Sequence, residues 1–170
     1  SGGTLTCTTT SLMLMGNGNG TYAWSGPNGF ASNDQNPTVS VPGSYTLTVT
    51  GANGCTSQAM AEVSADTDVP DAFIGFFFPL DCNTPTTNLT GSSTMTDVSF
   101  SWNGPNGYAS PDQTITVGVP GIYVLTVTAP NGCTASTQAN LQLDNTLPGA
   151  QASGGTLTCT TTSLMLMGNG

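Results

Sequence analysis

WSGPNGFASNDQNPTVSVPGSYTLTVTGANGC, residues 24–55, decides the fold, because the chain contains this stretch twice. The second version, WNGPNGYASPDQTITVGVPGIYVLTVTAPNGC, spans residues 102–133, and 22 of the 32 aligned positions are identical. Both alternate apolar and polar residues with the period of two typical of half-buried β-strands, most clearly in YTLTVT (45–50) and YVLTVT (123–128). Pro, Asn and Gly separate these runs, and they suit tight turns because Pro fixes φ while Asn and Gly accept positive φ. The sequence therefore predicts an all-β chain.

Two repeats define the domain organisation. Residues 153–170 repeat residues 1–18 letter for letter, which gives a period of 152 residues, and the inner similarity has an offset of 78. We expect module 1 at residues 1–72, module 2 at 73–150, and an incomplete further copy of module 1 at 151–170. About seven short strands per module predict tandem immunoglobulin-like antiparallel β-sandwiches.

Two pairs of aromatic residues are the best candidates for the core. Tyr45 in PGSY and Tyr123 in PGIY resemble the tyrosine corner of immunoglobulin-like sandwiches. Trp24 and Trp102 lie in alternating strands that lead directly into a turn, which favours a core position. The alternative is that each Trp is an exposed platform on which a sugar stacks.

Five cysteines at matched positions carry the covalent chemistry of the chain. Their spacing predicts the disulfides Cys7–Cys55 and Cys82–Cys133, each within one module, and a partner for Cys159 beyond Gly170. Such bonds indicate an oxidising, extracellular location. The alternative is that the thiols are buried and reduced. Zinc is disfavoured, because there is no His and no closely spaced Cys pair.

The charge balance excludes several functions. The chain has no Lys, Arg or His and nine acidic residues, for a net charge of −9. Contacts to nucleic-acid phosphates and to anionic lipids therefore lack their usual cations. We expect no enzyme activity and no cofactor, since no base is placed to activate a nucleophile. No apolar run is long enough to span a membrane. We also expect resistance to acid, because no positively charged side chains accumulate at low pH.

Acidic residues gather around the junction of the two modules. Carboxylates at a joint can hold Ca²⁺ and stiffen it, so these residues are a candidate metal site. The alternative is a solvated acidic linker. The candidate ligands are Asp66, Asp68, Asp71 and Asp81.

Comparison of the two modules reveals unexpected apolar residues. Leu14 aligns with Leu89, and we predict that its side chain points into the core. Met13 and Met15, on either side of it, stand where module 2 has polar residues. Phe76, Phe77 and Phe78 are likewise added before Cys82. Exposed apolar groups often mark a contact, so we predict that these Met and Phe residues form an interface between modules or chains. The alternative is that the Phe run fills the base of one sandwich and the joint between the modules.

The pattern C…W-x-GPNG-[FY]-x-S…PTVSVPGSYTLTVT-x-ANGC resembles the tandem Ig-like (PKD-like) modules of very large bacterial surface proteins, notably those associated with type IX secretion. The resemblance covers nearly the whole chain. It implies a β-sandwich, secretion to the cell surface, and a role as stalk, adhesin or matrix, with no catalytic residues.

Two functions therefore remain. The first is structural: the chain is part of a long extracellular fibre, sheath or stalk that associates with copies of itself. The second is adhesion, in which repeated modules bind a carbohydrate or another surface ligand with avidity from many copies. Near-identity of successive 152-residue units favours the structural role.

Overall fold

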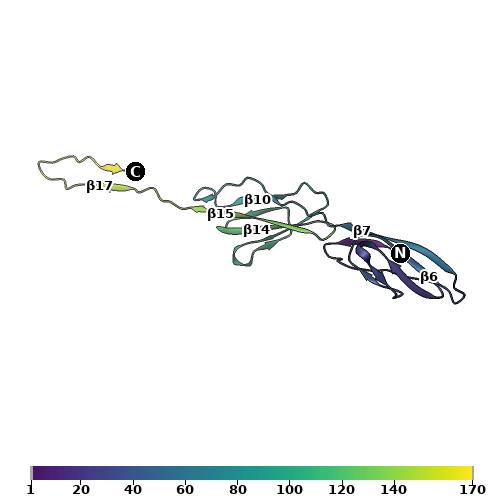
Figure 1. The fold of residues 1–170 in the computed structure, drawn as a ribbon. Helices are drawn as coiled ribbons and strands as arrows, with labels where there is room; N and C mark the ends of the chain where they lie inside the picture. Colours follow the sequence, from purple (N-terminus) through teal and green to yellow (C-terminus); the bar gives the residue numbers. More distant parts are fainter. Residues whose placement is uncertain (1, 170) are drawn as a thin grey trace.

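A long antiparallel hairpin with alternating buried side chains forms the centre of each module. The computed structural model describes residues 2–169. In module 1, β6 (Gly43–Thr50) pairs with β7 (Thr56–Asp66), and in module 2, β14 (Gly121–Thr128) pairs with β15 (Thr134–Leu141). The two modules lie end to end, and the C-terminal segment extends away from module 2 (Figure 1). The chain is all-β, with the layered sheets of immunoglobulin-like sandwiches.

Module 1 packs a five-stranded sheet, in the order β1-β7-β6-β3-β4, against the two-stranded pair β2-β5. All neighbours are antiparallel except β1, which runs parallel to the end of β7 with Thr6 opposite Asp66. The remaining strands of this module are β1 (Gly3–Thr6), β2 (Leu12–Met13), β3 (Thr21–Ser25), β4 (Ala31–Ser32) and β5 (Thr38–Val39).

Module 2 repeats this plan and adds one strand. Its four-stranded sheet has the order β12-β11-β14-β15, and the facing sheet has the order β13-β10-β8, in which β8 has no counterpart in the described part of module 1. The pair β9-β16 is parallel, with Asp81 opposite Asp144, and thus repeats the β1–β7 pairing. The remaining strands are β8 (Phe73–Ile74), β9 (Leu80–Asp81), β10 (Thr87–Ser92), β11 (Ser99–Asn103), β12 (Ala109–Ser110), β13 (Thr114–Val117) and β16 (Leu143–Asp144).

The predicted aromatic residues lie in the two cores. Trp24 and Tyr45 are 4% and 1% exposed in module 1, and Trp102 and Tyr123 are 0% and 2% exposed in module 2. Buried indoles cannot serve as sugar-stacking platforms, so the core interpretation holds for both tryptophans. Each tyrosine donates its hydroxyl to a carbonyl four residues upstream, as in a tyrosine corner: Tyr45 to Val41 at 2.7 Å and Tyr123 to Val119 at 2.9 Å.

The GPNG sequences form matching turns. Each is a short 3-10 segment, η1 (Pro27–Gly29) or η2 (Pro105–Gly107), that closes the hairpin after the Trp-bearing strand. Asn28 and Asn106 have φ of 55° and 56°. Asn tolerates this left-handed region better than most residues, because its short side chain bonds locally.

The C-terminal segment has the sequence of residues 1–18 but not their environment. β17 (Gln151–Ser153) pairs with β18 (Met167–Asn169) in a small antiparallel ribbon. Leu5 is 5% exposed in module 1, whereas its copy Leu157 is 60% exposed. Leu14 is fully buried, as predicted, whereas its copy Leu166 is 79% exposed. Among residues 2–169, no helix is long and apolar enough to cross a membrane.

Candidate functional site at the intermodule joint

The position of Cys7 follows from the direction of β1. Because β1 runs parallel to β7 with Thr6 opposite Asp66, Cys7 lies at the end of β7 that faces module 2. Cys55 immediately precedes Thr56, at the start of the same strand. The length of β7 separates these two ends by about 33 Å, at about 3.3 Å per residue. A disulfide requires Cα atoms about 4.4–6.8 Å apart, so Cys7 cannot reach Cys55.

The predicted disulfide pairing is therefore wrong. Cys7 is bonded to Cys133, with a Cα–Cα distance of 5.0 Å and a sequence separation of 126 residues. The prediction Cys82–Cys133 fails for the same reason, since Asp81 pairs with Asp144 at the far end of module 2. In the described chain Cys55, Cys82 and Cys159 are unpaired and exposed. The disulfide thus links the two modules instead of closing each one.

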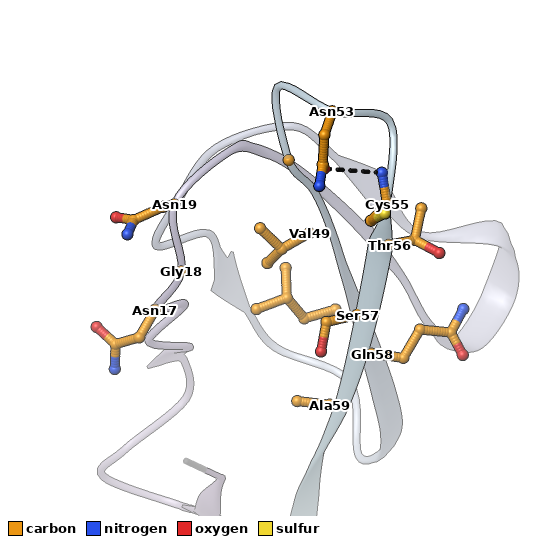
Figure 2. Close-up of a pocket in the computed structure, with 12 residues that line it drawn as sticks. Asn17, Gly18, Asn19, Val49, Asn53, Cys55, Thr56, Ser57, Gln58 and Ala59 are labelled. Carbon is orange, nitrogen blue, oxygen red and sulfur yellow. Dashed lines mark hydrogen bonds between the residues drawn. The ribbon is translucent and has the colours of Figure 1, made fainter.

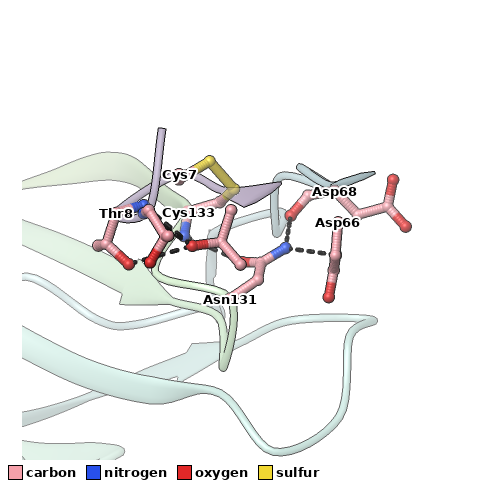
Figure 3. The surroundings of a disulfide bond; sticks show 8 residues. Cys7, Thr8, Asp66, Asp68, Asn131 and Cys133 are labelled. Carbon is pink, nitrogen blue, oxygen red and sulfur yellow. Dashed lines mark hydrogen bonds between the residues drawn. A yellow bond between two sulfur atoms is a disulfide. The ribbon is translucent and has the colours of Figure 1, made fainter. Parts of the chain in front are cut away.

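Asn131 adds polar contacts to the covalent bond (Figure 3). Its Nδ2 amide donates to the Asp66 carboxylate at 2.8 Å and to the Asp68 carbonyl at 2.9 Å. Its Oδ1 accepts the Cys133 backbone N–H at 3.0 Å. Both amide protons and the side-chain oxygen of Asn131 are thus hydrogen-bonded. The residue is only 9% exposed, so these bonds lie in a nearly closed joint. Composition and spacing did not single out this residue; its place in the APNG turn was the available signal.

The Ala129–Cys133 hairpin fits closely against module 1. Gly132 has a φ of +80°, and a Cβ atom added there would lie 2.4 Å from the Thr8 Cγ2 atom. Both the backbone conformation and the contact across the joint therefore require glycine.

The candidate Ca²⁺ ligands do not converge. Asp66 accepts from Asn131, and Asp81 accepts backbone N–H groups of its own turn, including that of Asn83 at 2.8 Å. Asp71 bonds to module 2, and Asp68 takes part in the joint through its backbone carbonyl. Within residues 2–169, no three His, Cys, Asp or Glu side chains gather as a metal-binding group. Donors of module 2 use the carboxylates of Asp66, Asp71 and Asp81 separately, so the structure does not bring the four predicted residues together as a Ca²⁺ site.

Asp71 fastens the linker to module 2. Its carboxylate accepts from the Ser93 hydroxyl at 2.6 Å, and from the Thr94 backbone N–H and hydroxyl, both at 2.8 Å. The side-chain hydrogen bond from Ser93 is the main cause that lowers the pKa of Asp71 from 3.8 to about 2, followed by the backbone bond from Thr94. The anchoring of the linker therefore requires the ionised carboxylate.

We expect stability to fall only in strong acid. The folded-state pKa of Asp71 is below its unfolded value, so its contribution is complete above about pH 4 and is lost as pH falls toward 2. Melting temperatures measured from pH 6 to pH 2 should stay level down to about pH 4 and then decline. Asp71→Asn should lower the neutral-pH value and flatten the decline. Asp97→Asn is the control, because Asp97 is exposed and makes no side-chain hydrogen bond within the described chain. A collapse between pH 6 and pH 4 would contradict this account.

The predicted Met and Phe interface residues differ in exposure. Met13 and Met15 are 61% and 57% exposed on module 1. Phe76 and Phe78 are 86% and 65% exposed on module 2, with ring centroids 5.0 Å apart, while Phe77 packs against the module 2 core. The alternative interpretation thus holds for Phe77. An interface through the other four residues stays a prediction.

Several solved structures align with most of this chain at low sequence identity. No protein-family model and no curated protein sequence matches it. A Ca²⁺-stabilised adhesin with which an Antarctic bacterium binds ice aligns over 88% of this chain and 46% of that one, with 14% identity and a TM-score of 0.49. A 1.5-MDa bacterial ice-binding adhesin aligns over 88% and 62%, with 14% identity and a TM-score of 0.45. Murine CEACAM1b aligns over 84% and 96%, with 11% identity and a TM-score of 0.40. At these identities and TM-scores the alignments say nothing about the function of this chain.

Proposed function

We propose that the chain is a non-catalytic structural element of a long extracellular stalk, sheath or fibre, of the bacterial cell-surface type that its sequence resembles. One observation carries this proposal: the Cys7–Cys133 disulfide joins consecutive modules. A bond within a module would stabilise that module alone, whereas a bond across the joint limits how the modules move relative to each other. Disulfides form in oxidising compartments, which supports an extracellular location.

The joint is fixed at more than one point. Domains joined by a small polar interface usually move relative to one another. Here the Cys7–Cys133 bond and Asn131 hold one side of the joint, and Asp71 holds the linker on module 2. Fixation at separate points resists hinge bending, which favours a rod and suits a stalk better than a flexible tether.

The rigidity of the joint can be measured in solution. Small-angle X-ray scattering of the oxidised chain should give the dimensions of two modules in one line. The double variant Cys7→Ser/Cys133→Ser should give a broader distribution of dimensions, and Cys159→Ser should match the parent chain. A broad distribution for the oxidised parent chain would refute a rod-like element.

Electron microscopy of secreted material tests the assembly itself. Antibodies against module 1 should label regular filaments at a constant repeat. Flexible single strands that end in a distinct tip would instead support the alternative function, an adhesin that presents repeated modules to a carbohydrate or another surface ligand.

A further inference from the structure

Module 2 holds a strand where module 1 has a hollow. β8 pairs with β10, with Ile74 opposite Gly91, and also contacts β15. Ala72 and Ile74 pack against the module 2 core. In module 1 the equivalent space lies between residues 17–19 and the start of β7, and it is an open cavity of about 330 Å³ (Figure 2). Val127 is fully buried on the wall of the filled space, whereas its counterpart Val49 is half-buried on the wall of the empty one.

The hairpin beside this cavity is shaped like the hairpin that docks in the joint. Gly51 donates its N–H to the Cys55 carbonyl at 2.8 Å, as Ala129 does to Cys133 at 2.9 Å. The Asn53 side chain accepts the Cys55 N–H at 3.1 Å, which repeats the bond between Asn131 and Cys133.

The surroundings of the two hairpins differ. Gly54 has a φ of +79°, close to that of Gly132, yet a Cβ atom added at Gly54 would meet nothing within 4 Å. Cys55 is exposed, whereas Cys133 is 1% exposed. The free hairpin of module 1 therefore has the docking conformation without a docking partner.

The outer end of module 2 repeats the surface that receives the docked hairpin. Asp81 and Thr84 close the Cys82 turn with a backbone bond of 3.1 Å, as Thr6 and Thr9 close the Cys7 turn at 2.9 Å. Asp144 stands opposite Asp81 in β16, as Asp66 stands opposite Thr6 in β7. The thiol of Cys82 and the carboxylate of Asp144 thus occupy the places of Cys7 and Asp66, and both residues are exposed.

The segment after Asp144 pairs with a copy of the cavity edge. In β17 and β18, Ala152 stands opposite Gly168 and Ser153 stands opposite Met167. Residues 167–169 have the sequence of residues 15–17, a stretch that ends at Asn17 on the edge of the module 1 cavity. This pairing matches that of β8 with β10 to within one residue. Residues 151–153 therefore have a demonstrated partner sequence at the edge of the empty cavity.

We propose that module 1 of a second copy of this chain docks on the outer end of module 2 and reproduces the internal joint. In this joint Cys82 bonds to the second copy's Cys55, and the second copy's Asn53 amide donates to Asp144. Residues 151–153 pair along the cavity edge of the second copy's module 1, in the place that β8 takes in module 2. The inference rests on the proposed structural role and adds the contact surfaces of the assembly. Because the two surfaces differ, the contact is head-to-tail and extends into a filament.

Geometry and redox balance agree with a bond between chains. Cys55 and Cys82 lie at the two outer ends of the paired modules, and β7 alone separates Cys55 from the joint by about 33 Å. One chain therefore cannot close this bond on itself. When the bond forms, the two thiols lose two protons and two electrons to a small-molecule disulfide, such as oxidised glutathione, which is reduced to two thiols.

Oxidation of the full chain tests the proposal. The experiment uses Cys159→Ser, which leaves Cys55 and Cys82 as the unpaired thiols of the described chain. With oxidised glutathione, a non-reducing gel should show a ladder of dimers, trimers and longer species. Because the chain has no Lys or Arg, trypsin cannot cleave it, and proteases that cut at aspartate and at aromatic residues are used instead. Their digest should contain a disulfide-linked pair of peptides with Cys55 and Cys82.

Complementary variants determine the polarity of the contact. With Cys159→Ser present, Cys55→Ser or Cys82→Ser alone should stay monomeric, whereas a mixture of the two should stop at dimers. In each variant, an intact Cys7–Cys133 bond shows that the chain is folded. Cys55–Cys55 or Cys82–Cys82 products, or no ladder from folded chain, would overturn the proposal.

The docking geometry has its own control. Asn53→Ala removes the amide that would reach Asp144 and should slow ladder formation roughly fivefold, as expected for the loss of one hydrogen bond. Asn33→Ala, a substitution at an exposed loop position of the same module, should leave the rate unchanged. Equal rates for the two variants would contradict the docking geometry. If X-ray scattering shows a rod but oxidation gives no ladder, this inference is refuted and the proposed function is not. If oxidation gives a ladder but X-ray scattering shows freely hinged modules, the proposed function is refuted and this inference is not.

Discussion

Replacing Cys7 and Cys133 together by serine is expected to cause one of the largest losses of stability of any substitution in this chain. The bond closes a loop with a sequence separation of 126 residues, and most of both modules lies inside that loop. In the chain-entropy model, closing a loop of this length contributes about 4–5 kcal/mol to the free energy of unfolding. The double variant avoids leaving one thiol free to pair wrongly with Cys55, Cys82 or Cys159.

The same substitution should also separate the unfolding of the two modules. With the bond intact, the two modules stay connected by both the linker and the disulfide. The hydrogen bonds of Asn131 to module 1 also couple the unfolding of one module to that of the other. Without the bond, calorimetry should resolve two transitions where the parent chain shows one. Each module contains one of the two tryptophans, so fluorescence of Trp24 and Trp102 can assign the transitions. Cys159→Ser should unfold like the parent chain, and an unchanged transition in the double variant would show that the joint does not couple the modules.

The disulfide pairing shows where sequence reasoning reached its limit. The alternating pattern, the GPNG turns and the PGxY motif are local signals, and each predicted a local structure that is present. The pairing of Cys7 depends on β1 running parallel to β7, a non-local choice that the four residues of β1 do not encode by their pattern. Reversing β1 at the same place would bring Cys7 only as far as Glu62, so the predicted bond to Cys55 would have needed a different register as well.

The acidic residues illustrate the same limit at the candidate site. Their clustering along the sequence suggested shared ligands, but a strand directs neighbouring side chains to opposite faces and a linker turns them further apart. Asp66 consequently faces Asn131 of module 2, while Asp71 faces Ser93. Asn131 is 65 residues from Asp66, so no local pattern could connect them. What the sequence did contain was the repeat, which relates Cys82 to Cys7 and Asn53 to Asn131.

Replacing Trp102 by alanine is the second change for which we expect a large effect. Trp102 is fully buried in the module 2 core, and truncation of a buried Trp typically costs about 3–5 kcal/mol. Its Nε1 also donates to the Asp112 carbonyl at 3.0 Å, a bond that the truncation removes. Because small domains are stable by only about 5–15 kcal/mol, module 2 should lose much of its stability. In the Cys7→Ser/Cys133→Ser background, where the modules are expected to unfold separately, the transition of module 1 reported by Trp24 fluorescence should stay unchanged.

Replacing each tryptophan by phenylalanine allows a matched comparison, because the two residues occupy equivalent sites but differ in the hydrogen bonding of their indole N–H groups. The Nε1 atom of Trp24 is buried and has no hydrogen-bond partner within the described residues, unlike that of Trp102. Trp24→Phe removes an unpaired donor, whose burial costs free energy in the folded state, whereas Trp102→Phe leaves the Asp112 carbonyl without its donor. Urea unfolding of the two variants, followed by circular dichroism, should show Trp102→Phe to be more destabilising by about 1–2 kcal/mol. The opposite order would mean that the packing of the two rings, and not the indole hydrogen bond, sets the difference between the modules.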